Sequence, residues 1–102
     1  MTLDDYSKRA ASTMVFSGSQ SDRLNYASIA LGGEVGEYLN EYKKWLRTGT
    51  ITPKGERLTN MLHELGDILY YLDRVSVELG SNLETVARLN NAKLAARYGK
   101  VG

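Results

Sequence analysis

Apolar side chains recur every seven residues through one long central stretch, and this spacing constrains the fold more than any other feature. The positions are Leu24, Leu31, Tyr38 and Trp45. They share one helix face, because an α-helix turns by about 100° per residue. A comparable stripe runs through residues 65–79. No segment alternates apolar and polar residues with a period of two, so we expect no strand. The pattern predicts an all-α protein.

Capping residues and glycines place the ends of the expected helices. Thr2 with Asp5, and Ser81 with Glu84, have the spacing of capping boxes. Four helices joined by short loops favour one four-helix bundle-like domain over residues 1–102. We expect helices from Thr2 to about Val15, from about Arg23 (after a cap at Ser21 or Asp22) to Arg47, from about Glu56 to Leu79, and from Ser81 to about Tyr98.

The composition excludes several classes of function. Thirteen basic residues stand against twelve acidic ones, for a net charge of +1, which does not favour binding to nucleic acid. Cys is absent and His63 is the only His, so thiolate and His-rich metal sites are excluded. No apolar run approaches the length of a membrane span, and the acidic start does not resemble a secretory signal. We therefore expect a cytoplasmic protein that does not bind membranes.

The same acidic motif occurs twice, once in each of the two long central helices. Each copy has an acid, a branched apolar residue, Gly, a second acid, any residue and Leu. The acids are Glu34 and Glu37 in the second helix, and Glu64 and Asp67 in the third. Residues three apart lie on one helix face, and each acidic pair borders the apolar stripe of its helix. Packing the two stripes together would bring the four carboxylates to one edge of the core.

Four adjacent carboxylates repel one another unless a cation neutralises them. Oxygen ligands suit a hard ion, so the pattern predicts a site for Mg²⁺, with Mn²⁺ as a possible substitute. Surface acids spaced by three residues are common on solvated helix faces, and it is the repetition of the motif that favours a metal site. Gly36 and Gly66 within the motifs remove side chains beside the acids, which allows close approach of a helix or a ligand.

In these motifs the sequence resembles the all-α nucleoside triphosphate pyrophosphohydrolases, and in particular their small MazG-like members. The resemblance implies hydrolysis of an NTP or dNTP to the monophosphate and pyrophosphate. It also implies Mg²⁺ held by the four acids, and a homo-oligomer, a dimer or tetramer. Many relatives carry a further Glu where this chain has Gly33, and Glu41 is a candidate substitute. The similarity extends over segments 3–6, 30–37, 64–72 and 90–98.

The last expected helix carries a polar and basic stripe of Asn90, Lys93 and Arg97. Arg holds phosphate oxygens bidentately, although basic residues near a helix C-terminus also interact favourably with the helix dipole. The resemblance favours substrate binding by these residues and Tyr98. Trp45 is a candidate for stacking on a base, with a role as a core or interface anchor as the alternative.

The reaction that we expect is metal-assisted hydrolysis at the α-phosphorus, with Glu34 as the base that takes the proton of water. Three alternatives remain open. A phosphoribosyl-ATP pyrophosphohydrolase would use the same metal chemistry, and only substrate profiling separates the two enzymes. A non-catalytic helical interaction module would use the acids as surface charge. A regulatory nucleotide-binding protein would keep the site and lack turnover. The small size and the wide apolar stripes favour a homo-oligomer, with a tetramer built from dimers preferred.

Overall fold

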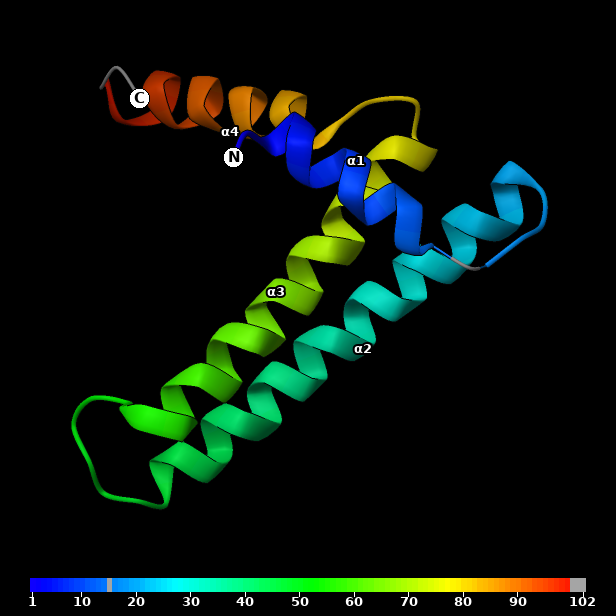
Figure 1. Cartoon of the computed structure of the whole chain (residues 1–102). Coiled ribbons are helices and arrows are strands. Elements are labelled where there is room, and N and C mark those ends of the chain that lie inside the picture. Colours follow the sequence, from blue (N-terminus) through cyan, green and yellow to red (C-terminus); the bar gives the residue numbers. More distant parts are fainter. Residues whose placement is uncertain (15, 100–102) are drawn as a thin grey trace.

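The computed structural model describes residues 1–14 and 16–99, and this part of the chain is helical with no strand (Figure 1). The all-α class predicted from the sequence is therefore confirmed. None of the described helices has both the length and the apolar character needed to cross a membrane. The elements in chain order are α1 (Leu3–Thr13), α2 (Gln20–Leu46), α3 (Gly55–Glu78) and α4 (Leu83–Tyr98).

The N-terminal ends of α1 and α2 are both closed by capping boxes. Thr2 caps α1 as predicted, because its hydroxyl accepts from the Asp5 amide at 3.1 Å and the Asp5 carboxylate accepts from the Thr2 amide. In α2 the cap is Ser19, so the predicted cap at Ser21 or Asp22 was wrong. Asp22 takes part as the third helical residue of the box, and the helix consequently begins earlier than expected. The predicted end of the first helix, Val15, lies outside the described residues.

The turn between α3 and α4 places the cap of α4 one residue later than predicted. Gly80 has a φ of +81°, and the amides of Gly80 and Ser81 donate to Val77 and Ser76 at 2.9 and 3.0 Å. This is the Schellman arrangement that ends a helix. Ser81 is therefore used in closing α3, and the predicted Ser81–Glu84 capping box was wrong.

The cap of α4 is instead Asn82, whose side chain accepts from the Thr85 amide at 2.8 Å. At the other end, Gly99 has a φ of +65° and accounts for the predicted end at Tyr98. Both ends of α4 are thus fixed by local hydrogen bonding and backbone conformation.

Helices α2 and α3 pack against each other as an antiparallel hairpin, and this is the most extensive contact in the described chain (Figure 1). Helix α1 packs on α3. Helix α4 contacts α1 and α3 but not α2, and it projects away from the hairpin. The four helices of one chain thus do not close into the predicted bundle, because the turn through Gly80 directs α4 outwards.

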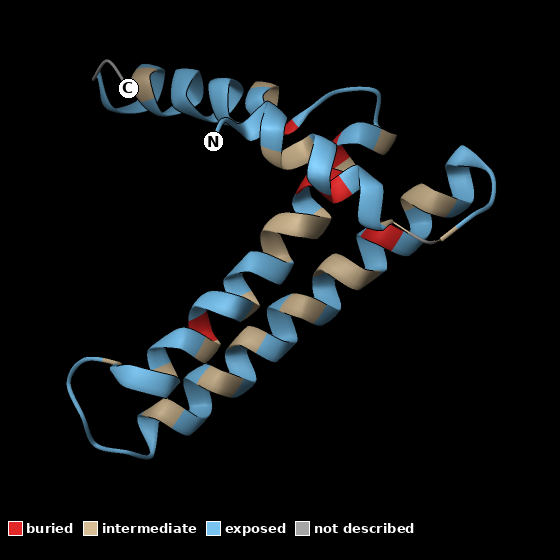
Figure 2. Cartoon of the chain, in the orientation of Figure 1, coloured by how far each residue is buried: buried red, intermediate tan, exposed pale blue. Residues whose placement is uncertain are grey.

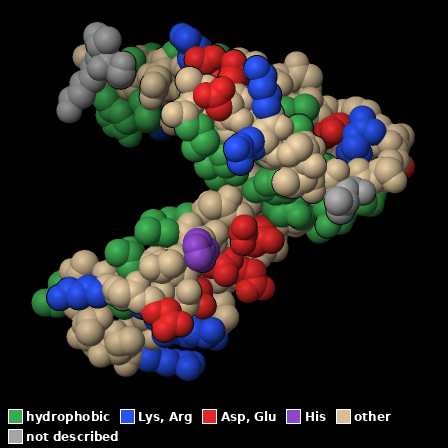
Figure 3. Space-filling model, in the orientation of Figure 1, with side chains coloured by type: hydrophobic (Ala, Val, Ile, Leu, Met, Phe, Trp, Pro, Cys, Tyr) green, Lys and Arg blue, Asp and Glu red, His purple; other side chains and the backbone are tan. Residues whose placement is uncertain are grey.

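Few apolar side chains are fully buried in this arrangement, as Figure 2 shows. The buried apolar residues are Ala10, Ala27, Met61 and Leu83. Much of the apolar surface of α2, α3 and α4 faces outwards. Figure 3 shows hydrophobic side chains on both sides of the hollow between α4 and the hairpin. The most exposed aliphatic residues of the helices are Ile29 (78%), Leu89 (66%), Leu46 (59%), Leu39 (56%) and Leu62 (56%), and Leu79, the C-cap of α3, is 65% exposed.

A buried ion pair lies where α1 packs on α3. The Asp73 side chain has no exposed surface and pairs with Arg74 at 2.5 Å. Arg74 also donates to the carbonyl oxygen of Ser7 at 3.2 Å, which ties α1 to α3. The second carboxylate oxygen of Asp73, Oδ1, is buried without a hydrogen-bond partner in the described chain. Neither residue was predicted from the sequence, because a neighbouring acid and base on a helix form no recognisable pattern.

Replacing Arg74 by Met should lower the free energy of unfolding by about 3–5 kcal/mol, since the change leaves a buried carboxylate without its cation. Urea denaturation followed by circular dichroism measures this loss. The matched control is the double variant Asp73→Leu with Arg74→Met, in which both charges are removed and most of the stability should return. Equal losses in the single and double variants would contradict this description of the pair.

Candidate metal centre

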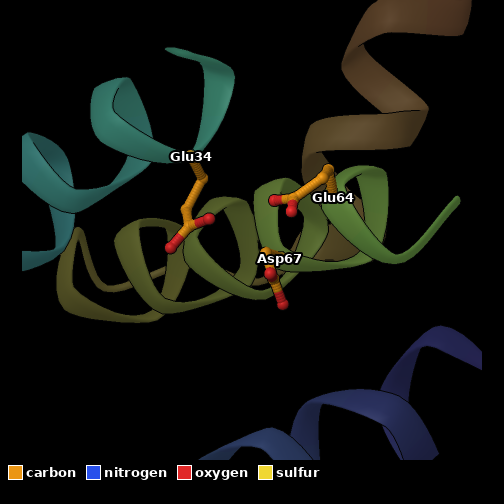
Figure 4. Close-up of side chains that lie close together, drawn as sticks. All are labelled: Glu34, Glu64 and Asp67. Carbon is orange, nitrogen blue, oxygen red and sulfur yellow. The ribbon is translucent and has the colours of Figure 1, made fainter. Parts of the chain in front are cut away.

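Three carboxylates converge where the middle of α2 faces α3. Glu34 comes from α2, and Glu64 and Asp67 come from successive turns of α3 (Figure 4). Each offers a carboxylate oxygen, and these oxygens all lie within 4.8 Å of one another. Glu34 and Glu64 are partly buried, whereas Asp67 is exposed. The expected meeting of the two motifs is therefore observed for three of the four acids.

Glu37, the fourth predicted ligand, lies outside this group. Its side chain is exposed on α2, one turn after Glu34. Its charge still acts at the site, as it contributes to raising the pKa of Glu34.

The carboxylates of the cluster repel one another. Burial raises the pKa of Glu34 above its usual value, and the charges of Asp67, Glu64 and Glu37 raise it further, in that order. Within residues 1–14 and 16–99, no Lys, Arg or His forms an ion pair with Glu34, Glu64 or Asp67. Figure 3 shows acidic side chains gathered at the middle of the hairpin. The group therefore has the charge of a cation site, and no basic side chain of the described residues pairs with it.

The glycines of the two motifs border open space. A Cβ atom added at Gly33, Gly36 or Gly66 would meet nothing within 4 Å. Close approach of α2 and α3 does not require these glycines, so that interpretation of the motif does not hold within one chain. The other interpretation, that they keep room for a ligand beside the acids, is compatible with the open space.

Two tyrosines lie close enough to the cluster for its charges to act on them. Burial raises the pKa of Tyr71 to about 12, with smaller contributions from Tyr26, Tyr70 and Glu34. Burial also raises the pKa of Tyr6, and the charges of Asp73 and Asp67 add to that effect. Tyr6 was not predicted from the sequence, because only the tertiary packing of α1 brings that residue close.

The predicted phosphate-binding residues do not reach the acids within one chain. Asn90, Lys93, Arg97 and Tyr98 are all exposed on α4, and α4 does not contact α2. No ion pair in the described chain links α4 to the three carboxylates. Asn90 and Lys93 instead line a shallow depression on α4 together with apolar side chains.

Two further candidates lie near the tip of the hairpin. The indole Nε1 of Trp45 donates to the Thr50 hydroxyl at 3.1 Å, so Trp45 anchors the loop that follows α2. Glu41 pairs with Arg57 at 2.5 Å and with Lys44 at 3.5 Å. It does not join the cluster, and its expected substitution for the ligand missing at Gly33 is not observed.

The donor set fits a hard divalent cation. Carboxylate oxygens are the ligands that Mg²⁺ and Mn²⁺ prefer, and the spacing of Glu34, Glu64 and Asp67 allows one ion to contact all three. A bound cation would also remove the repulsion that raises the pKa of Glu34. Glu34, Glu64 and Asp67 are therefore the residues that could hold a metal.

Comparison with known proteins relates the chain to a phage protein. No family model and no solved structure matches the chain. The Gene 37 protein of Mycobacterium phage L5 is 34% identical over 103 residues, which cover 95% of this chain and 89% of the phage protein. At this identity and coverage, the chain belongs to the same family as the Gene 37 protein of Mycobacterium phage L5.

Proposed function

We propose that the protein is a cytoplasmic, Mg²⁺-dependent pyrophosphohydrolase of the MazG-like, all-α type. Its substrate is a nucleoside or deoxynucleoside triphosphate, which water cleaves at the α-phosphorus to give the monophosphate and pyrophosphate. The observation that carries the proposal is the approach of Glu34, Glu64 and Asp67 within 4.8 Å across two helices. These acids belong to the repeated motif that resembles the metal-binding signature of that family.

Different residues would bind the metal, take the proton and hold the phosphates. Glu64, Asp67 and Glu34 would hold the metal, which supplies charge neutralisation and a more acidic bound water. Glu34 is the proposed base, since it comes from α2 and faces the two acids of α3 across the site. Lys93 and Arg97 would hold phosphate oxygens and stabilise the pyrophosphate that leaves.

A homo-oligomer completes this proposal. In one chain α4 lies away from the acids, and the apolar stripes of the hairpin face outwards. A second copy packed against the hairpin would bury those stripes. It would also place a basic α4 beside a carboxylate cluster. We therefore propose a dimer or tetramer whose substrate site is shared between chains.

Pyrophosphate release from a panel of NTPs, dNTPs and phosphoribosyl-ATP with Mg²⁺ tests the function. Glu34→Gln and Asp67→Asn should each lower kcat by about 100-fold or more, with unchanged circular dichroism. Glu56→Gln, an exposed acid of α3 outside the cluster, is the matched control and should keep full activity. Wild-type rates in both cluster variants would contradict the proposal, as would a wild-type protein that is inactive on the whole panel.

Without metal, the cluster should make stability fall as pH rises. The pKa of Glu34 is higher in the folded chain than its ordinary value of 4.5, so the folded state binds more protons between those two pKa values. Its free energy of unfolding therefore decreases through that window and stays lower above it. Urea denaturation in EDTA should show this decrease in the wild type and a smaller one in Glu34→Gln. Mg²⁺ should remove the difference near neutral pH. Parallel pH profiles for the two proteins would contradict the electrostatic description.

Sedimentation velocity at micromolar concentration should show a dimer or tetramer. Leu62→Glu, on the outward apolar face of α3, should shift the protein to monomer, because a charge at a buried interface is unfavourable. Ile51→Glu, in the exposed α2–α3 loop and 94% exposed, is the control and should leave the assembly intact. A wild-type monomer at this concentration would refute the oligomer.

A further inference from the structure

We propose that the tip of the α2–α3 hairpin binds the phosphoryl group of a small anion, at a site separate from the carboxylate cluster. A pocket of about 670 Å³ opens there between the end of α2, the loop and the start of α3. Its walls combine an aromatic ring, several hydroxyl groups and two basic side chains. They include Trp45, Thr48, Thr50, Thr52, Lys54 and Arg57.

Positive charge is concentrated at this tip. Residues 41–57 contain five basic and two acidic side chains, whereas the rest of the chain contains more acidic than basic residues. One of the two acids, Glu41, already forms ion pairs with both Arg57 and Lys44. Lys54 lines the pocket, is exposed and makes no ion pair in the described chain. The local field therefore attracts anions even though the whole chain is almost neutral.

Arg57 also lines the pocket, and its guanidinium is only partly used by the protein. Its Nη1 donates to Glu41, and its Nε is buried without a hydrogen-bond partner in the described chain. The N–H groups at Nη1 and Nη2 that Glu41 does not use are donors for a phosphoryl oxygen in the pocket. Hydrogen bonds between guanidinium and phosphate are among the stronger ones in proteins.

The loop is already ordered around the aromatic wall. The Trp45 indole donates to the Thr50 hydroxyl at 3.1 Å, and the hydroxyls of Thr48 and Thr50 are 2.7 Å apart. The Thr48 hydroxyl also bonds to the Trp45 carbonyl oxygen at 2.8 Å. Little conformational freedom would be lost on binding, which favours affinity. The indole ring also offers a surface on which a base can stack.

The tip is distinct from the proposed catalytic cluster. Trp45 follows Glu34 by eleven residues, which corresponds to roughly 16 Å along α2 at 1.5 Å per residue. No acid of the cluster lines the tip pocket. The ligand is either a free phosphate or pyrophosphate ion, or the phosphate of a nucleotide, and the shared chemistry is the phosphoryl group.

Trp45 is the only Trp in the chain, so its fluorescence reports on this pocket alone. We would titrate the full chain with inorganic phosphate, pyrophosphate and a nucleoside monophosphate, in EDTA and at constant ionic strength set with chloride. A saturable fluorescence change is expected. Similar affinities for all three ligands identify a free anion site, and tighter binding of the nucleotide indicates stacking on the indole.

Lys54→Gln should weaken binding at least about tenfold, the equivalent of one charge-assisted hydrogen bond. Lys54 makes no side-chain capping bond at the start of α3, so its replacement leaves the fold intact. Lys8→Gln on α1 and Glu34→Gln in the cluster are the controls and should bind as the wild type does. The proposal is refuted by the absence of a saturable change, by unaltered affinity in Lys54→Gln, or by loss of binding in Glu34→Gln.

Discussion

The packing of α2 against α3 is the constraint on which the rest of the structure depends. It is the most extensive contact between helices in the described chain. The antiparallel arrangement places the middle of one helix opposite the middle of the other, so the two acidic motifs meet without any contribution from a long loop. The same packing raises the free energy of the metal-free protein, because it gathers carboxylates with which no cation of the described residues forms an ion pair. This unfavourable electrostatic energy is the physical reason for proposing that a cation binds there.

The sequence predicted the parts of the fold that local rules control. The heptad stripes predicted the long helices, and Thr2 with Asp5 predicted the first cap. The glycines at positions 80 and 99 explain why α3 and α4 end where the sequence predicted. The caps at Ser19 and Asn82 were missed, since several polar residues in each loop had suitable chemistry. Ser81 does not cap α4, because its amide takes part in the Schellman turn at Gly80 that ends α3.

Tertiary features were less accessible to sequence reasoning. Three of the four acids meet as expected, whereas Glu37 is exposed on α2 and lies outside the group. The direction of α4 depends on the turn at Gly80, and the periodicity of α4 itself does not reveal it. The Asp73–Arg74 pair and its bond to Ser7 hold α1 on α3. The sequence spacing of Ser7, Asp73 and Arg74 does not predict that they are in contact.

Diffraction from crystals of the protein grown with Mn²⁺ tests the central claim most directly. Manganese takes the oxygen ligands that magnesium prefers, and its anomalous scattering identifies the ion without reference to activity. We expect an anomalous peak between α2 and α3, bonded to oxygens of Glu34, Glu64 and Asp67 at about 2.0–2.6 Å, the range of hard cations. A map at saturating Mn²⁺ with no peak among these three carboxylates would contradict the metal centre and the function built on it.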